Sequence, residues 1–295
     1  MPSFNQLVDL RKQVQGKKLK KPAKWLFPHN AERHYRIILH QLVRELTYEI
    51  RDRLVPVYPE LLAEVEATYP NNDEKCTRSE LMHKKSQNLD MRMDDWSDRL
   101  RGIFLSIAEF IKPKVKETII QMETIGNEIS NFNQEQFQKV NRSVFGIDIF
   151  VDQPYLTDQL ELFSRQNAQL ITSIPEQDLL QVAGIVERGL QQGTRFTNVA
   201  RDIQKRFGIT MRRANLIARD QTTKLNSSLT QLRQESAGIT HYIWQTAGDE
   251  RVRPTHRAND GKKFSWDKPP ATTGHPGHDI NCRCVAIPVM EGIIE

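Results

Sequence analysis

The sequence predicts an α+β fold, with a mostly helical, elongated N-terminal and central region and a small C-terminal antiparallel sheet. Three observations support this prediction. Apolar residues recur at steps of three and four over much of the first 236 positions, which is the spacing of one helix face. The last 55 residues contain three short runs of strand character between turn signals. Several histidines and cysteines lie among those turns, and they suggest that a bound zinc ion stabilises the small sheet.

The N-terminal half predicts a series of helices within residues 31–145. The first spans 31–54, where one stripe holds the apolar residues Tyr35, Ile38, Leu39, Leu42, Leu46, Ile50 and Leu54. A second helical pattern covers 89–110, and Pro113 should break or kink it. A third stretch continues to about residue 129, and 131–145 should form a shorter helix.

A change of character after residue 145 indicates a linker over 146–172. Beyond it, Ser173 and Pro175 resemble a helix N-cap and first turn, so a helix should follow over about 176–191. Gly208 should end the next helix, and Thr210 should cap a long one that reaches about Ser236. The predicted organisation is therefore an arm (1–30), a helical region (31–145), the linker, and a C-terminal domain (173–295).

The segment 197–218 has the short turn and basic second helix of a helix-turn-helix, which would suit a DNA-binding regulator. Its second helix runs about 26 residues, which is much longer than a recognition helix. A packed helical hairpin with a basic outer face is the preferred interpretation.

The C-terminal 55 residues predict a small antiparallel sheet. The run 241–247 alternates in polarity, and 263–266 and 285–289 are two further strand candidates. Such a small core usually needs a metal or disulfide to stabilise it.

Composition narrows the class of protein. Mean hydropathy is −0.59, and there is no apolar run long enough for a membrane span, so no membrane partner is expected. The N-terminus lacks a signal peptide's apolar stretch. Two of the three cysteines are separated by one residue, which indicates a reducing compartment instead of a disulfide framework.

Basic residues are concentrated in two places. Residues 11–24 carry seven Lys or Arg and no acid, and Arg188 to Arg219 holds eight against one acid, Asp202. The net charge is +5, which favours a polyanionic partner, here double-stranded DNA bound without sequence preference. A solvated arm is the alternative for 11–24. The candidate DNA contacts are Lys17, Lys18, Lys20, Lys21, Arg212 and Arg213.

The stretch HPGHDINCRC, residues 275–284, joins two histidines to two cysteines, and a further histidine lies upstream. Thiolates and imidazoles are the preferred zinc ligands, and four of them form a closed structural site. The candidates are His256, His275, His278, Cys282 and Cys284. Ordinary polar loop residues are the alternative, and the residue types alone do not choose between the two.

The C-terminal half resembles the Mu F-like head morphogenesis family of tailed phages, also called the minor head protein family. The resemblance rests on ANLIARDQTTKLN (214–226), WQTAGDERVRPTHRANDGKKF (244–264) and HPGHDINCRCVAIPV (275–289), in that order. It covers about 175–290 and favours the metal interpretation. On this basis the expected zinc ligands are His256, His278, Cys282 and Cys284, with His275 as the substitute for His278.

The resemblance implies a structural protein of the virion and not an enzyme. Members of the family associate with the portal protein, and some are linked to head assembly, DNA packaging or ejection. Major capsid or scaffold proteins are further expected partners. The expected location is the capsid interior, with the host cytoplasm during assembly. The N-terminal helical half is the expected portal contact, because its stripe over 35–54 is apolar and the flank of that stripe is basic.

A metal-dependent nuclease or other DNA-processing enzyme is the alternative function. A zinc deaminase is excluded, because that class needs H-x-E and P-C-x-x-C, whereas this chain has H-R-A and N-C-R-C. The H-E-x-x-H protease motif is also absent from the sequence. Four protein ligands would favour a structural metal, whereas three ligands plus water would favour chemistry at the metal.

Overall fold

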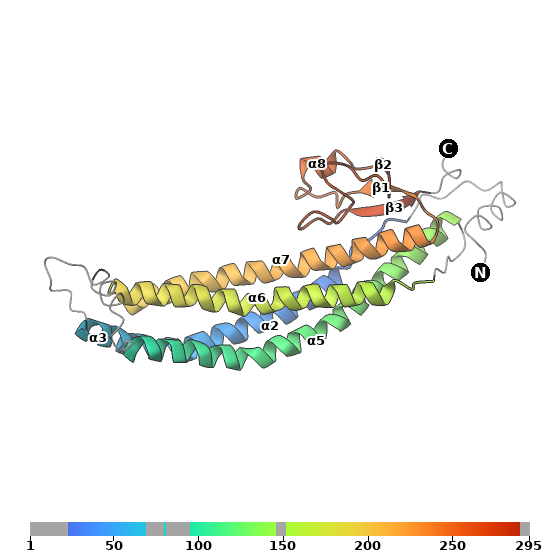
Figure 1. Cartoon of the computed structure of the whole chain (residues 1–295). Helices are drawn as coiled ribbons and strands as arrows, with labels where there is room; N and C mark the ends of the chain where they lie inside the picture. The colour runs from blue at the N-terminus through green and yellow to red at the C-terminus, as the bar shows by residue number, and fades with distance from the viewer. Residues whose placement is uncertain (1–22, 69–79, 81–94, 146–151, 290–295) are drawn as a thin grey trace. The chain divides into compact units, whose positions relative to one another are not determined.

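A computed structural model describes residues 23–68, 80, 95–145 and 152–289 of the chain (Figure 1). The described elements are, in chain order, α2 (His29–Leu54), α3 (Tyr58–Thr68), α5 (Asp95–Phe145), α6 (Leu156–Gln191), α7 (Phe196–Ser236), β1 (His241–Gln245), α8 (Pro254–Arg257), β2 (Lys263–Ser265) and β3 (Val285–Val289). Long helices followed by a small antiparallel sheet confirm the predicted fold class. In the described part of the chain, no helix is long and apolar enough to cross a membrane.

The chain divides into two compact units, and each is built from separate stretches of sequence. The sheet unit comprises 1–35, 121–167 and 216–295, and the helical unit comprises 36–120 and 168–215. Long helices therefore contribute one part to each unit. This division differs from the predicted series of consecutive regions, because antiparallel helices bring distant stretches of sequence together.

The helical unit has a core of aliphatic side chains from α2, α3, α5, α6 and α7. Its fully buried members include Leu39, Leu46, Ile50, Leu61, Ile107, Ile171, Val182, Val186 and Leu190. The apolar stripe predicted for 35–54 is thus a real helix face, but it packs into the protein's own interior. The buried stripe is therefore no exposed surface for the portal, and a portal contact by the N-terminal helical half stays a prediction.

The helices continue through residues that were expected to begin or end them. Pro113 lies inside α5 and Pro175 inside α6, and α7 runs without a break past Gly208. The linker prediction for 146–172 is wrong from Leu156 onward, where α6 begins. The helix-turn-helix alternative also fails, because 197–218 contains no turn.

A buried polar contact helps to explain why α7 continues at Thr210. Asp178 of α6 is fully buried and accepts hydrogen bonds from Arg206 Nε, at 2.8 Å, and from the Thr210 hydroxyl. Thr210 therefore anchors α7 to α6 within the helical unit and caps no helix. An interior glycine costs a helix only about 1 kcal/mol, so packing of this kind can override it.

The three strands form one antiparallel sheet in the order β2-β1-β3, as the sequence predicts. Each face of the sheet covers an apolar cluster. One cluster comprises Trp25, Phe137, Val140, Ala237, Ile239, Val285 and Ile287. The other comprises Tyr242, Trp244, Trp266, Cys282, Cys284 and Ala286. The cysteines of the motif thus belong to the second core.

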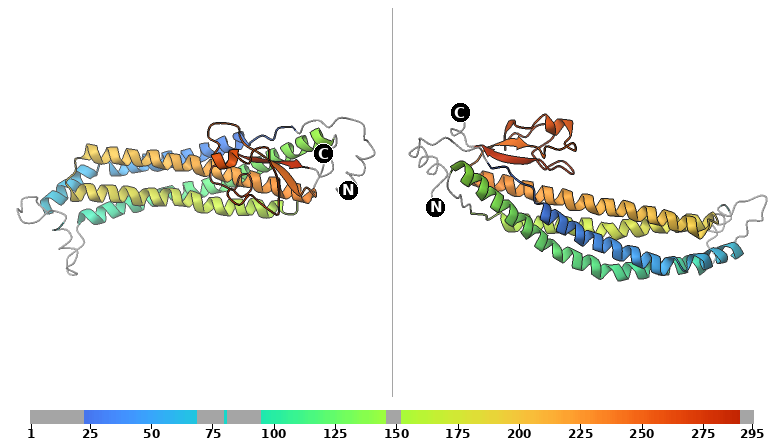
Figure 2. Two further views of the ribbon diagram at one scale, coloured as in Figure 1. Left: turned by 90° about the horizontal axis from the view of Figure 1, so that it is seen from above. Right: turned by 180° about the vertical axis from the view of Figure 1, so that it is seen from behind.

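The sheet lies beside the C-terminal part of α7, as both views in Figure 2 show. The fully buried Gln234 of α7 connects the two, because its Nε2 donates to the Ala286 carbonyl at 2.9 Å and its Oε1 accepts from Trp266 Nε1 at 3.1 Å. Ser227 of α7 donates to the Pro276 carbonyl. These contacts fix the loop that carries the histidines and cysteines.

Candidate metal centre

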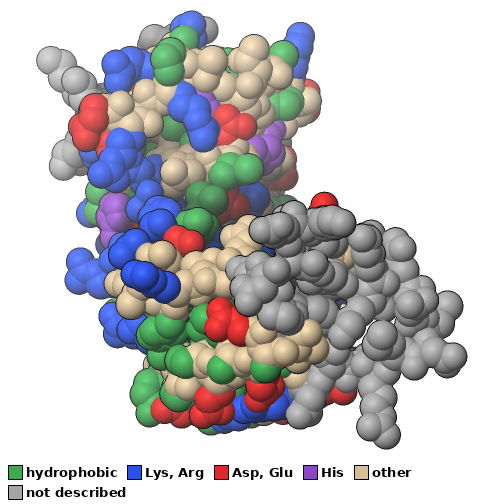
Figure 3. All heavy atoms as spheres, turned by 90° about the vertical axis from the view of Figure 1, so that its left-hand side faces the viewer, with side chains coloured by type: hydrophobic (Ala, Val, Ile, Leu, Met, Phe, Trp, Pro, Cys, Tyr) green, Lys and Arg blue, Asp and Glu red, His purple; other side chains and the backbone are tan. Residues whose placement is uncertain are grey.

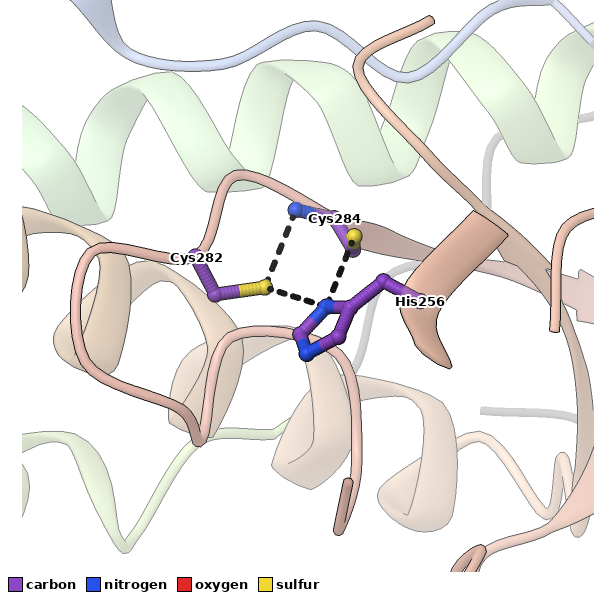
Figure 4. Close-up of side chains that lie close together, drawn as sticks. All are labelled: His256, Cys282 and Cys284. Carbon is purple, nitrogen blue, oxygen red and sulfur yellow. Dashed lines mark hydrogen bonds between the residues drawn. The ribbon is translucent and has the colours of Figure 1, made fainter. Parts of the chain in front are cut away.

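His256, Cys282 and Cys284 converge from two segments of the sheet unit. His256 lies in the short helix α8, whereas the cysteines lie in the loop that leads into β3, and the three side chains point toward one another (Figure 4). His256 Nδ1 lies 3.5 Å from each of the two Sγ atoms. All three residues are buried, with exposed fractions of 3%, 4% and 6%.

This spacing fits a tetrahedral metal. Zinc lies about 2.3 Å from a thiolate sulfur and about 2.0–2.1 Å from an imidazole nitrogen, so a tetrahedral angle places N and S about 3.6 Å apart. The observed 3.5 Å separations agree with that value for both pairs. One metal ion could therefore contact all three atoms without moving the backbone.

The two thiols have unequal acidity. A hydrogen bond from the Cys284 thiol, helped by the Cys284 backbone N–H, lowers the pKa of Cys282 to about 6 although burial opposes this shift. The same thiol–thiol hydrogen bond, together with burial, raises the pKa of Cys284. Cys282 therefore offers a thiolate near neutral pH, which is the form that binds metals. A bound dication would favour deprotonation of Cys284 as well.

A carboxylate holds the imidazole from its other side. Asp279 Oδ2 lies 2.7 Å from His256 Nε2, and the Trp244 ring meets the imidazole edge to face at a centroid distance of 5.4 Å. Carboxylate–histidine pairs of this kind orient metal ligands and increase their basicity. The sequence prediction missed Asp279, although it stands inside the HPGHDINCRC motif between His278 and Cys282.

The loop before the cysteines adopts a constrained backbone. Asn281 has a φ of +61°, in the left-handed region that non-glycine residues rarely adopt. Its backbone N–H donates to Asp220 Oδ1 of α7 at 3.1 Å, which holds this conformation. The chain then turns so that Cys282 and Cys284 both face His256.

The structure brings together three of the four predicted ligands and leaves out His278. Among the described residues, the group that could hold a metal consists of His256, Cys282 and Cys284. His278 instead packs against His275, with ring centroids 5.2 Å apart. His275 Nδ1 is 2.8 Å from the Tyr242 hydroxyl, so His275 is a core residue and does not replace His278 as a ligand. The four-ligand prediction therefore needs correction to three.

A pocket of about 160 Å³ opens over the three candidate ligands. Its lining includes all three of them and the four arginines Arg219, Arg251, Arg253 and Arg283. No Asp or Glu belongs to the described lining. From the sequence alone, Arg251 and Arg253 could bind phosphate or pair with local acids, and local pairing was slightly preferred.

The six residues predicted to contact DNA differ in where they lie and in how exposed they are. Lys17, Lys18, Lys20 and Lys21 lie outside the described residues. Arg212 is exposed on α7. Arg213 is half-buried and donates to the Ser173 carbonyl at 3.2 Å and to its hydroxyl at 2.7 Å, so it serves the packing of α7 on α6.

Comparison with known proteins agrees with this fold and motif. Residues 181–287 match the family model of Phage Mu protein F like proteins, so this region of the chain is similar to that family. The match contains α7, β1, β2, the first part of β3 and the candidate metal centre. The resemblance inferred from the sequence is thereby confirmed, and a role in phage head morphogenesis is supported.

Three curated proteins are similar to parts of the chain. The chain is 43% identical over 149 residues to an uncharacterized protein of Haemophilus influenzae and 28% identical over 148 residues to minor head protein GP7 of Bacillus phage SPP1. It is 32% identical over 119 residues to NAD(+)--arginine ADP-ribosyltransferase EFV of Enterococcus faecalis. These matches cover 50%, 45% and 36% of this chain.

The chain spans less than half the length of each of these relatives. The matches cover 33%, 46% and 24% of the Haemophilus, SPP1 and Enterococcus proteins. The names of the SPP1 and Enterococcus proteins therefore describe molecules that share only part of this chain. No solved structure matches the chain.

Proposed function

We propose that the protein is a minor head protein of a tailed phage that associates with the portal and contacts double-stranded DNA without sequence preference. The family match and the relative named minor head protein support the assembly role. Other head proteins are the expected partners, the capsid interior is the expected final location, and the host cytoplasm is its expected location during assembly. The observation that carries the DNA contact is a basic face on α2.

That face lies in the helical unit. Arg44 and Arg51 are exposed on α2 and stand seven residues apart, which is two helical turns, so they share one side of the helix. Among the described residues neither forms an ion pair, so both charges are available to a partner. Figure 3 shows Lys and Arg side chains gathered along one side of the molecule.

The same face carries an aromatic side chain. Tyr48, between the two arginines, is 65% exposed, and it lines a groove of about 360 Å³ with Phe207 and Met211 of α7. The Arg51 guanidinium lies 5.9 Å from the centre of the Phe207 ring. Exposed arginines that contact phosphates suit binding to duplex DNA without sequence readout.

DNA binding is tested by salt titration of affinity for duplexes of unrelated sequence. Affinity should fall steeply with salt, and Arg44→Ala/Arg51→Ala should lower the slope of log K against log salt by up to about 2. Lys112→Ala is the matched control, because Lys112 is exposed but already paired with Glu109 at 3.6 Å. An unchanged slope in the double variant, or binding to one sequence only, would refute this part of the proposal.

Portal association is tested by co-purification with the portal protein and by cryo-electron microscopy of assembled heads. The variant must preserve α2, because deletion of residues 1–60 would remove part of the buried core. Tyr48→Ala leaves the core intact and removes the exposed aromatic ring. Absence of the chain from the head, or a position remote from the portal, would contradict the proposal.

We further propose that His256, Cys282 and Cys284 bind one zinc ion with a structural role. The ion would connect α8 to the loop before β3, and metal binding at such sites contributes on the order of 10 kcal/mol in zinc-finger peptides. Three protein ligands leave a position for water, but the described lining of the pocket contains no carboxylate, and its histidine, His256, is itself a proposed ligand. These residues therefore offer no free general base of the kind that metal hydrolases usually use, which disfavours the nuclease alternative. Elemental analysis of protein purified without chelator should give one zinc per chain.

A further inference from the structure

The pocket over the candidate metal centre has a composition that zinc binding alone does not explain. Four arginines line it, and they come from three segments of the sheet unit. Arg219 belongs to α7, Arg251 and Arg253 precede α8, and Arg283 stands between the two cysteines. A structural metal site needs no such concentration of positive charge.

Three of the arginines are held in place by acids. Arg283 pairs with Asp249, Arg219 with Glu32 at 3.2 Å, and Arg253 with Asp279 at 3.4 Å. These pairs fix the guanidinium groups at the edge of the pocket and leave other N–H donors available, because each guanidinium carries five. The pocket is thus pre-organised for an acceptor.

Arg251 is the fourth, and it makes no ion pair within the described part of the chain. It is exposed at the pocket. The four arginines carry four positive charges and their three acidic partners carry three negative charges, so one positive charge remains. A dication bound by two thiolates adds none, so the pocket retains its attraction for an anion when the metal is present.

The three protein ligands also leave one tetrahedral position free, and the pocket is lined by all three of them. Its volume of about 160 Å³ is well above the roughly 10–15 Å³ that one water molecule requires. A group larger than water can therefore reach the metal from this side.

We propose that this pocket binds one phosphate-class oxyanion at the open position of the metal, with Arg251 and the three held arginines as its donors. The inference rests on the proposed metal site. A tetrahedral oxyanion fits better than a carboxylate, because the donors surround the opening from three segments instead of presenting one planar fork. The phosphate can be free or can belong to nucleic acid.

The test uses the full chain loaded with cobalt(II), whose absorption reports the coordination of the metal. Titration with inorganic phosphate should change the spectrum in a saturable way, and metal content measured afterwards should still be one per chain. Arg251→Ala should weaken phosphate binding at least about tenfold, since it removes a charged donor without leaving an acid unpaired. Lys268→Ala is the control, because it removes an exposed charge of the same unit outside the pocket.

The outcomes separate this inference from the metal proposal. If no metal binds, both fail. If the metal binds but phosphate leaves the spectrum unchanged, or if Arg251→Ala behaves like the wild type, only the oxyanion site is refuted. An equal response to acetate would overturn the choice of phosphate over carboxylate. Short duplexes with and without 5′-phosphates then distinguish a nucleic-acid end from free phosphate as the source.

Discussion

Asp279 and His256 form a directed pair at the candidate metal centre, with Oδ2 of the aspartate 2.7 Å from Nε2 of the imidazole. Nε2 donates a hydrogen bond to the carboxylate and so carries the ring proton. The lone pair of Nδ1 then faces both sulfur atoms. The pair therefore selects the tautomer that a metal requires. This role for Asp279 gives the first prediction.

Asp279→Asn should weaken zinc binding about 10- to 100-fold while the chain remains folded, because the amide orients the imidazole less well and makes it less basic. Competition with a chromophoric chelator measures the affinity. Asp267→Asn is the control, since Asp267 is exposed in the same unit and bonds only locally to Ser265. Equal affinities in the two variants would mean that the pair does not support the metal.

The choice of histidine ligand is tested by metal content. His256→Ala and Cys282→Ser should abolish stoichiometric zinc, because each removes one of three ligands. His278→Ala should keep close to one zinc per chain, since His278 lies outside the group. Loss of zinc in the His278 variant, with circular dichroism unchanged, would restore the four-ligand site expected from the sequence.

Gly277 is required where the histidine loop approaches α7. A Cβ at this position would lie 2.6 Å from the Ser227 Cβ, and the residue has a φ of +89°. Gly277→Ala should therefore destabilise the protein by about 2–4 kcal/mol, from steric overlap and backbone strain together. Gly248→Ala shares the positive φ but meets open space, so it should cost only about 1 kcal/mol. Denaturant unfolding of the two variants compares these values, and equal losses would contradict the packing argument.

Asp178 should be important for the stability of the helical unit. Asp178→Ala leaves the Arg206 guanidinium, 18% exposed, without its carboxylate and frees the Thr210 hydroxyl, at an expected cost of about 2–4 kcal/mol. Asp202→Ala removes an exposed pair with Lys205 and should leave the free energy of unfolding nearly unchanged. Chemical unfolding measures both, and a small effect at Asp178 would refute its structural role.

The histidine pair predicts a pH dependence. Desolvation lowers the pKa of His275, which is buried, and of His278, which is exposed but partly covered by its neighbours, below the ordinary value of 6.5. As the pH falls below about 6.5, the unfolded chain therefore binds protons that the folded chain resists, and the free energy of unfolding decreases. Above about pH 6.5 the two histidines contribute their full stabilisation, and their contribution to the free energy of unfolding no longer changes with pH.

The measurement compares unfolding free energies from pH 7.5 to 5 in the wild type and in His275→Gln/His278→Gln. The double variant should show a smaller decrease over this range, whatever its absolute stability. Protonation of the metal ligands affects both proteins, so the difference in slope isolates the two histidines. Parallel curves would show that the pair is not protected from protonation.

The sequence by itself determined the kinds of element and the chemistry of the site. A helical period over 31–54 and alternation over 241–245 correspond to α2 and β1, because periodicity follows directly from backbone geometry. The thiols and imidazoles of the motif supplied candidate metal ligands, and the family resemblance favoured a metal over an ordinary polar loop. These properties are local, so they can be read without knowing which segments pack together.

Tertiary structure decided where helices end and which ligands meet. Pro113, Pro175 and Gly208 lie inside helices although local propensity opposes them. Burial along whole helix faces offsets costs of about 1–3 kcal/mol for each such residue. Local signals therefore placed the breaks wrongly.

The same reason explains the error at His278 and the omission of Asp279. The loop turns at Gly274, Gly277 and Asn281, all with positive φ, and α7 fixes it through Ser227 and Asp220. Which side chains then face His256 depends on contacts between residues far apart in the sequence. Spacing within the motif specified the candidate ligands, but only these distant contacts selected three of them and placed four arginines around the remaining position.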